Sequence, residues 1–395
     1  SRSPEYILYV CGGVNQVNQG FHLLGWLRGA MALSGWTYYP LNIPDVNWSY
    51  RGRNLRLSGE FGTVSWKMPR GFSPETIHQD LLFVASEVLL SPFMKGILDG
   101  WVPTRSPGSQ CGLSLSGGID STACMAIMPE DTVLLHHRRS FRSLLKHDGA
   151  DRLFKYLNQK SGRTVHSIPS DHENIRAHWG KSIGFSTDMA AAVHMILLAD
   201  HFDLRGVAIG MPLDNTYLWH GFRYRDFSTT AWWQRWGSLF KSVGLDIILP
   251  IAGVSEATAV RIVQDAGLGH IVSSCLRAKH PGCGRCWKCF HKNGMLGHPY
   301  NIDSNEIQTF LSKRPVRTAT HALWWVNEQN HWDQVPDLSH MSELDFSWWT
   351  KHHPPAFDLL PDWIRLVIQS AIEAATEPIP EDSSFHTWDL FPDAD

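Results

Sequence analysis

Short apolar runs alternate with amphipathic stretches through the middle of the chain. Strand-like runs cover residues 113–115, 132–135, 164–168 and 207–210, and apolar residues recur at helical spacing between them, most clearly over residues 188–199. Strands that alternate with helices are typical of a parallel sheet with helices on both faces. The pattern therefore predicts an α/β fold with a doubly wound parallel sheet.

The two ends of the chain have different patterns. Near the start, residues 6–10 form a strand-like run, and residues 55–58 and 63–66 alternate around a Gly-containing turn, which predicts a β-hairpin. The Ser-Pro pair at residues 73–74 predicts the first turn of a helix. After residue 300 the pattern is helical and rich in tryptophan.

A connector rich in Pro, Gly and Ser at residues 101–109 separates the N-terminal pattern from the alternating strands and helices in the middle of the chain. We therefore expect an N-terminal α+β domain at residues 1–104, the α/β domain at residues 105–300, and a helical extension at residues 301–395. No segment repeats at a fixed period, which excludes solenoids and propellers.

Composition and charge narrow the classes of function. The 395 residues include 35 Lys and Arg against 38 Asp and Glu, and the resulting net charge of −3 disfavours a nucleic-acid-binding protein. No apolar run reaches the length of a membrane span, and the first residues lack the layout of a secretory signal. We expect a cytoplasmic protein that does not bind membranes, and a homodimer is compatible with the sequence.

Tryptophan is unusually frequent for a chain with few charges. Twelve of the 18 tryptophans lie beyond residue 218, and seven of these fall within residues 301–395. Because the indole ring suits both heterocycles and protein surfaces, we expect these tryptophans to form a substrate or partner surface rather than core.

Four of the seven cysteines fall within fifteen positions. Such short separations allow four thiolates to converge on one tetrahedral ion, and a full shell of sulfur favours a structural Zn²⁺. An iron–sulfur cluster accepts the same ligands and is the alternative. The predicted ligands are Cys275, Cys283, Cys286 and Cys289.

A glycine-containing loop between a predicted strand and a predicted helix is the strongest sign of chemistry. Glycines let the backbone turn tightly and approach a ligand, and the start of the following helix presents unpaired N–H groups to an anion. Asp120 stands where it could hold a Mg²⁺ ion that bridges phosphates. The predicted phosphate contacts are Ser116, Gly117, Gly118, Ile119, Asp120, Ser121 and Thr122.

The string Ser-Gly-Gly-Ile-Asp-Ser after a strand resembles the PP-loop of the N-type ATP pyrophosphatases. Together with the later cysteine quartet, it resembles the 7-cyano-7-deazaguanine synthase (QueC) family over residues 110–296. The resemblance implies that ATP and Mg²⁺ adenylate a 7-carboxy-7-deazaguanine carboxylate, and that a nitrogen nucleophile then displaces AMP. It also implies that Ser116 and Asp120 are the catalytic residues.

Residues farther along the chain are expected to complete the site. By the resemblance, His136 at the end of the second strand borders the adenine, and Gly210 and Asp214 lie near the substrate. Trp219 and Arg223 follow these residues, and an aromatic ring and a guanidinium plane suit a flat deazapurine.

Three places differ from the family pattern. Thr187 and Asp188 replace an Arg-Asn pair, Glu256 stands in the place of a lysine, and His291 and Lys292 replace an arginine. With its two flanking segments, the chain resembles the longer QueC-like proteins of the antiviral Qat and type IV CBASS gene clusters. This implies that the acceptor is an amine of a partner protein bound by the flanking domains. The alternatives are a nitrile synthase that uses ammonia, a binding module without turnover, and tRNA thiolation.

Overall fold

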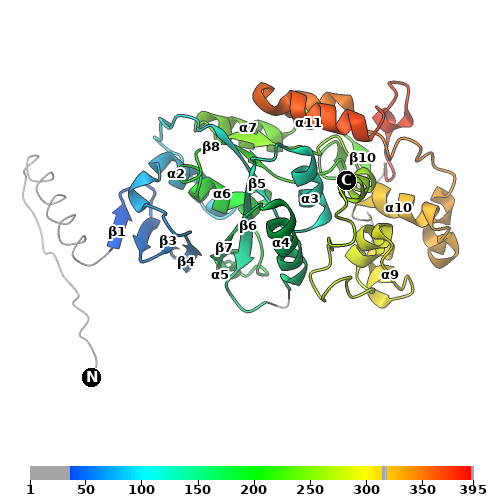
Figure 1. Cartoon of the computed structure of the whole chain (residues 1–395), viewed down its shortest axis with the longest axis horizontal. Coiled ribbons are helices and arrows are strands. Elements are labelled where there is room, and N and C mark those ends of the chain that lie inside the picture. Colours follow the sequence, from blue (N-terminus) through cyan, green and yellow to red (C-terminus); the bar gives the residue numbers. More distant parts are fainter. Residues whose placement is uncertain (1–35, 144, 314–315, 317, 393–395) are drawn as a thin grey trace, which may run out of the picture.

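One mixed sheet runs through the molecule. The computed structural model describes residues 36–143, 145–313, 316 and 318–392, and nine strands within these residues form the sheet. Figure 1 shows helices on both of its faces. The strand predicted at residues 6–10 lies outside the described residues.

Five parallel strands form the centre of the sheet and one of its ends. In spatial order they are β7 (Val165–Ser170), β6 (Val133–Arg139), β5 (Gln110–Ser114), β8 (Leu204–Ala208) and β11 (Asp246–Ile248). The four apolar runs expected to be strands thus lie side by side. The predicted α/β fold is confirmed for this part of the chain.

Four antiparallel strands continue the same sheet beyond β7. The last of them joins β7 through the pair Trp66 and Ser170, and the last two are the predicted hairpin. The N-terminal strands therefore extend the central sheet instead of forming a sheet of their own. They are β1 (Trp36–Tyr39), β2 (Asn47–Arg51), β3 (Asn54–Gly59) and β4 (Gly62–Lys67).

Two apolar cores lie on the two faces of the sheet. One face is covered by α3 (Ile119–Ile127), α4 (Asp148–Ser161), α8 (Glu256–Asp265) and α11 (Asp362–Ala375). The other face is covered by α2 (Gln79–Leu90), α6 (Val193–Leu197) and α7 (Ala231–Ser242). Helices on both faces are what a doubly wound sheet requires.

Two predicted helices differ from the expectation. The Ser-Pro pair opens only a 3₁₀ turn, and α2 begins later, where the His78 side chain accepts a hydrogen bond from the Asp80 amide. The long apolar helix expected over residues 188–199 is divided into a 3₁₀ turn and α6, because Ala192 leaves helical geometry at φ −110° and ψ 6°.

The remaining elements lie mostly after β8. Figure 1 shows α9 and α10 at the end of the molecule opposite β1 to β4. Among the residues that the structure describes, no helix combines the length and apolar character that a membrane span requires. The remaining helices and strands include α5 (Ile175–His178), β9 (Leu218–Trp219), β10 (Arg223–Tyr224), the π-helical turn η5 (Cys289–Asn293), α9 (Asn305–Ser312) and α10 (Ala319–Glu328).

The C-terminal tryptophans are mostly core residues, and the expectation of a partner surface is wrong for them. Trp348 and Trp349 are 1% and 0% exposed, and Trp324, Trp325 and Trp388 are also buried. The indole N–H of Trp388 donates to Thr320 Oγ1 at 2.7 Å. For Trp349 and Trp388 the indole N–H has a hydrogen-bond partner inside the protein, which allows the whole ring to be buried.

The connector at residues 101–109 is tied to its surroundings. Asp80 in α2 accepts hydrogen bonds from the Trp101 indole at 2.8 Å and from the amides of Thr104 and Arg105 at 2.6 and 2.8 Å. The Arg105 guanidinium pairs with Asp200 at 2.8 Å and reaches the carbonyls of two further segments. The two sides of the connector are therefore held in one arrangement.

Replacing Asp80 by Ala should lower the free energy of unfolding by about 2–4 kcal/mol, because one buried amide, one part-buried amide and an indole N–H lose their acceptor. Chemical denaturation of the full chain measures this. The control is Asp362→Ala, which removes a carboxylate that is 95% exposed and should change stability little. Equal effects of the two changes would contradict the role given to Asp80.

Candidate active site

The order of the parallel strands creates a crevice at the carboxyl ends of β5 and β8. The chain leaves β5 toward α3 on one face, whereas β8 is followed by α7 on the other face. Where neighbouring parallel strands send their connections to opposite faces, a gap opens outside their carboxyl ends, and ligands bind there. Residues 116–118 follow β5, and Gly210 follows β8, so both predicted segments lie at this gap.

Close backbone contacts hold the loop at residues 116–118. Gly117 has φ +81°, and a Cβ there would lie 2.6 Å from the Ala150 Cα in α4. A Cβ on Gly210 would lie 2.9 Å from the carbonyl carbon of Asp120. The loop and the first turn of α3 therefore fit between α4 and the end of β8 only because both positions are glycine.

Hydroxyl groups surround the amides of the loop. Ser121 Oγ accepts from the Ser116 amide at 3.1 Å and lies 2.9 Å from Ser116 Oγ. Thr122 Oγ1 donates to the Gly118 carbonyl at 2.8 Å. The predicted phosphate contacts are thus gathered around the N-terminus of α3, where N–H groups and hydroxyls can donate to an anion.

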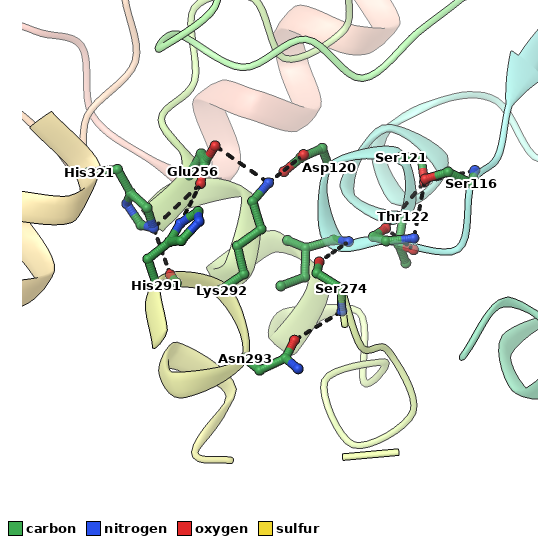
Figure 2. A network of polar contacts seen from close by, with 12 residues as sticks. Ser116, Asp120, Ser121, Thr122, Glu256, Ser274, His291, Lys292, Asn293 and His321 are labelled. Atoms are coloured by element: carbon green, nitrogen blue, oxygen red, sulfur yellow. Dashed lines mark hydrogen bonds and ion pairs between the residues drawn. The ribbon is translucent and has the colours of Figure 1, made fainter. Parts of the chain in front are cut away.

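Lys292 lies between two carboxylates at this loop (Figure 2). Its ammonium is 2.6 Å from Asp120 Oδ2 and 3.4 Å from Glu256 Oε1, and its side chain is only 8% exposed. Burial lowers the pKa of Lys292, but the nearby charges of Asp120 and Glu256 outweigh it and raise that pKa above the ordinary value. Lys292 is therefore a charged ammonium group inside the protein.

Asp120 offers an oxygen that fits a cation. While Oδ2 pairs with Lys292, the buried Oδ1 has no hydrogen-bond partner among the described residues. A carboxylate oxygen is a ligand that Mg²⁺ prefers. Asp120 would be the one protein ligand of the ion, as is common for Mg²⁺ that arrives with a nucleotide.

Glu256 is enclosed by histidines on its other side. Its Oε2 lies 3.1 Å from His291 Nδ1 and 3.6 Å from His321 Nε2. These three side chains are close enough to hold a metal ion, but the hydrogen bonds argue against one. His321 Nδ1 accepts the Trp349 indole N–H at 3.3 Å, so Nε2 carries the proton and donates to the His291 carbonyl at 2.7 Å. His291 Nδ1 is therefore the histidine atom nearest to Glu256 Oε2, whereas His321 holds the backbone carbonyl of His291.

A cavity of about 650 Å³ opens beside the loop. Ser116, Asp120 and Ser121 lie at its wall, and aromatic side chains of Trp219, Phe227 and Trp232 contribute other parts of its lining. Its volume is in the range of small-molecule sites. Its further lining residues are Ser114, Phe185, Ser186, Thr187, Asp188, Ala191, Ile209, Gly210, Met211, Asn215, His220 and Arg225.

Seven of the residues predicted to contact the nucleotide or the substrate do not line this cavity: Gly117, Gly118, Ile119 and Thr122 of the loop, and His136, Asp214 and Arg223. His136 is buried beneath the loop, where its Nδ1 lies 2.9 Å from the Leu115 carbonyl. Arg223 pairs with Asp389 at 2.8 Å near the end of the chain. Asp214 is fully buried. Its burial, and to a smaller extent the nearby charge of Glu256, raise its pKa well above the ordinary value, which favours its protonated form.

The cysteine quartet is assembled as expected. Sulfur–sulfur distances are 3.8 Å from Cys283 to Cys289, 3.9 Å from Cys286 to Cys275, and 3.6 Å from Cys286 to Cys289. Four zinc–sulfur bonds of about 2.3 Å in a tetrahedron place the sulfurs about 3.8 Å apart. The four cysteines can therefore hold a zinc ion, which would supply a rigid structural link between their segments.

Asn293, just after the quartet, connects it to the loop. Its Nδ2 lies 3.7 Å from Cys289 Sγ, and its Oδ1 accepts from the Ser274 amide at 2.9 Å. The Ser274 hydroxyl in turn accepts from the Ile119 amide at 3.3 Å (Figure 2). Because Lys292 lies in the same turn η5, the fold of the cysteine segment sets the position of Lys292 relative to Asp120.

The sequence pattern does not indicate several of the residues at this site. Glu256 and Lys292 stand out only as departures from a family pattern, and no motif includes Ser274 or His321. Lys292 stands three positions after the last cysteine, and this spacing was the one available signal. The aromatic residues Phe227 and Trp232 are near Trp219 in sequence, but nothing in their spacing indicates that they face a common cavity.

A family model matches part of the chain. The model of a family of unknown function, DUF6395, matches residues 235–389. No curated protein matches the chain. The matched part begins in α7 and includes the cysteine quartet, Glu256, α10 and α11. It runs across the domain boundary expected at residue 300, so these elements form one unit in that family model.

The full chain should be isolated with about one zinc ion per molecule, because four thiolates fill the coordination shell. Elemental analysis by mass spectrometry measures the metal. Cys286→Ser should lose most of it, whereas Cys111→Ala, a buried cysteine in β5, should keep it. Iron with sulfide in place of zinc would contradict the prediction.

Gly117→Ala should destabilise the protein by about 3 kcal/mol or more, since it combines a left-handed backbone with a clash against α4. Gly162→Ala is the matched control, because φ is +66° there and no atom lies within 4 Å of the added Cβ. The control should cost about 1–2 kcal/mol. Thermal denaturation compares the two, and equal losses would show that the approach of Ala150 to the loop is not restrictive.

Proposed function

We propose that this protein is an ATP-dependent ligase of the QueC-like type. A carboxylate oxygen of a 7-carboxy-7-deazaguanine-type acid attacks the α-phosphorus of ATP and releases pyrophosphate. A nitrogen nucleophile then attacks the acyl carbon, forms a C–N bond and releases AMP. The observation that carries the proposal is the placement of the Ser-Gly-Gly loop and α3 at the crevice between β5 and β8, beside the aromatic cavity.

The loop suits the leaving pyrophosphate. The amides at the start of α3 and the hydroxyls of Ser116 and Ser121 are close to one another, and both serines line the cavity. Asp120 would hold the Mg²⁺ that accompanies ATP, and Mg²⁺ would neutralise charge on the phosphates. Preorganised donors and a nearby ammonium such as Lys292 stabilise the charge that develops on a departing pyrophosphate.

The cavity suits a flat, polar heterocycle. Trp219, Phe227 and Trp232 can face the rings of a deazapurine, and Asp188, Asn215 and Arg225 are polar side chains in the same lining. Such a mixture favours an aromatic substrate with several hydrogen-bonding groups over an aliphatic acid. Gly210 and Trp219, both expected to be near the substrate, belong to this lining.

We propose an amine of a partner protein as the nitrogen nucleophile. Glu256, His291 and Lys292 depart from the QueC pattern and form a buried network with His321, which lies in the region beyond the resemblance. A rebuilt site next to added C-terminal structure favours a changed acceptor. A nitrile synthase that uses ammonia is the second candidate, since the parts that activate the acid are common to both.

The activation step can be tested without knowing the acceptor. The protein is incubated with ATP, Mg²⁺, 7-carboxy-7-deazaguanine and hydroxylamine, which converts an acyl adenylate into a hydroxamate. Hydroxamate, AMP and pyrophosphate should form in equal amounts. Absence of all three from the folded protein would contradict the proposed function. With ammonia alone, steady formation of the nitrile would favour the second candidate.

Variants assign the activity to the loop. Asp120→Asn and Ser116→Ala should lower pyrophosphate release at least a hundredfold, because each removes a group at the phosphates. Ser242→Ala is the control, since that hydroxyl donates to the Leu239 carbonyl on an exposed part of α7. Undiminished release in both loop variants would remove the loop from the mechanism.

A further inference from the structure

We propose that Lys292 controls the affinity of Asp120 for a divalent cation: the ammonium neutralises Asp120 in the nucleotide-free protein, and the phosphates of a bound nucleotide draw it away. The proposal rests on the proposed function, since it assigns a regulatory step to the same site. It concerns the two carboxylates that share this ammonium, Asp120 and Glu256.

The ion pair occupies the carboxylate that a cation needs. Lys292 Nζ lies 2.6 Å from Asp120 Oδ2, and Asp120 lines the cavity with its side chain 25% exposed. An ammonium at this distance and a divalent cation on the same carboxylate repel each other, and they do so more strongly near a protein interior than in water. The affinity of Asp120 for a cation is therefore reduced as long as Lys292 stays in place.

Glu256 allows Lys292 to shift without losing its counter-ion. Glu256 Oε1 is 3.4 Å from the ammonium, and the Glu256 side chain is only 4% exposed. His291 Nδ1 lies 3.1 Å from its other oxygen, and His321, whose ring is fixed by the Trp349 indole, donates to the His291 carbonyl. A buried charge without a partner costs several kcal/mol, so an ammonium with a second, fixed carboxylate can leave the first one at lower cost.

A neighbouring lysine offers a matched control. The Lys288 ammonium lies 5.6 Å from the centre of the Trp287 ring, one turn before Lys292. No ion pair of Lys288 with Asp120 occurs among the described residues. Removing either lysine removes one positive charge from the same segment, but only Lys292 touches Asp120. A difference between the two variants therefore reports the contact itself.

The test is a titration of the full chain with Mn²⁺, followed by electron paramagnetic resonance, with and without the α,β-methylene analogue of ATP. Wild type should bind Mn²⁺ weakly alone and at least tenfold more tightly with the analogue. Lys292→Met should bind Mn²⁺ about tenfold more tightly than wild type in the absence of nucleotide. It should also lose most of the gain that the analogue gives, whereas Lys288→Met should change Mn²⁺ affinity much less, because Lys288 acts on Asp120 only at longer range.

Two further measurements separate the ways in which the proposal can fail. If Lys292→Met does not fold, the double variant Lys292→Met with Glu256→Gln replaces it, because it leaves no unpaired charge at Glu256. It should bind Mn²⁺ about tenfold more tightly than wild type in the absence of nucleotide. Equilibrium dialysis measures binding of the analogue itself. Wild type that binds no analogue contradicts the proposed function. Unchanged Mn²⁺ affinity in both Lys292 variants, or an equal rise in Lys288→Met, overturns the role of Lys292.

Discussion

A charged ammonium group inside a protein requires carboxylates at short range, and this requirement shapes the site around Lys292. Taking an ion out of water costs several kcal/mol, and only close, well-held partners repay it. Asp120 supplies one carboxylate from the start of α3, and Glu256 supplies the other from the start of α8. The positions of α3, α8 and the turn η5 are therefore linked through one charge.

The same requirement draws the C-terminal part of the chain into the site. Glu256 is itself buried, and part of its surroundings comes from His321 in α10, whose ring is fixed by Trp349. Thr320, the neighbour of His321, donates to the Gly221 carbonyl at 2.6 Å and accepts from Trp388. Residues beyond 300 thus pack against the buried charges, and the indole groups of Trp349 and Trp388 fix the residues that make this contact.

Local features of the site could be predicted from sequence, and contacts between distant segments could not. The cysteine spacing and the Ser-Gly-Gly loop are short strings whose geometry follows from backbone chemistry: the four cysteines converge as expected, and the loop lies between a strand and a helix. Lys292 and Asp120 are 172 positions apart, and their contact depends on the order of strands and on the turn after the quartet. The pairing of β4 with β7 is of the same kind, because alternation in a strand indicates a buried face but not a neighbour.

That pairing makes β7 an interior strand of the sheet although the parallel order would leave it at the rim. Strand β4 meets the outer side of β7 at its last residue through the pair Trp66 and Ser170, and Asp171 reinforces the junction by accepting from the Ser65 amide at 2.6 Å. An uncovered β7 would present a row of unpaired N–H and C=O groups to any passing chain, and such an edge is a template for aggregation. The N-terminal strands thus shield the carboxyl end of this edge from pairing with another chain.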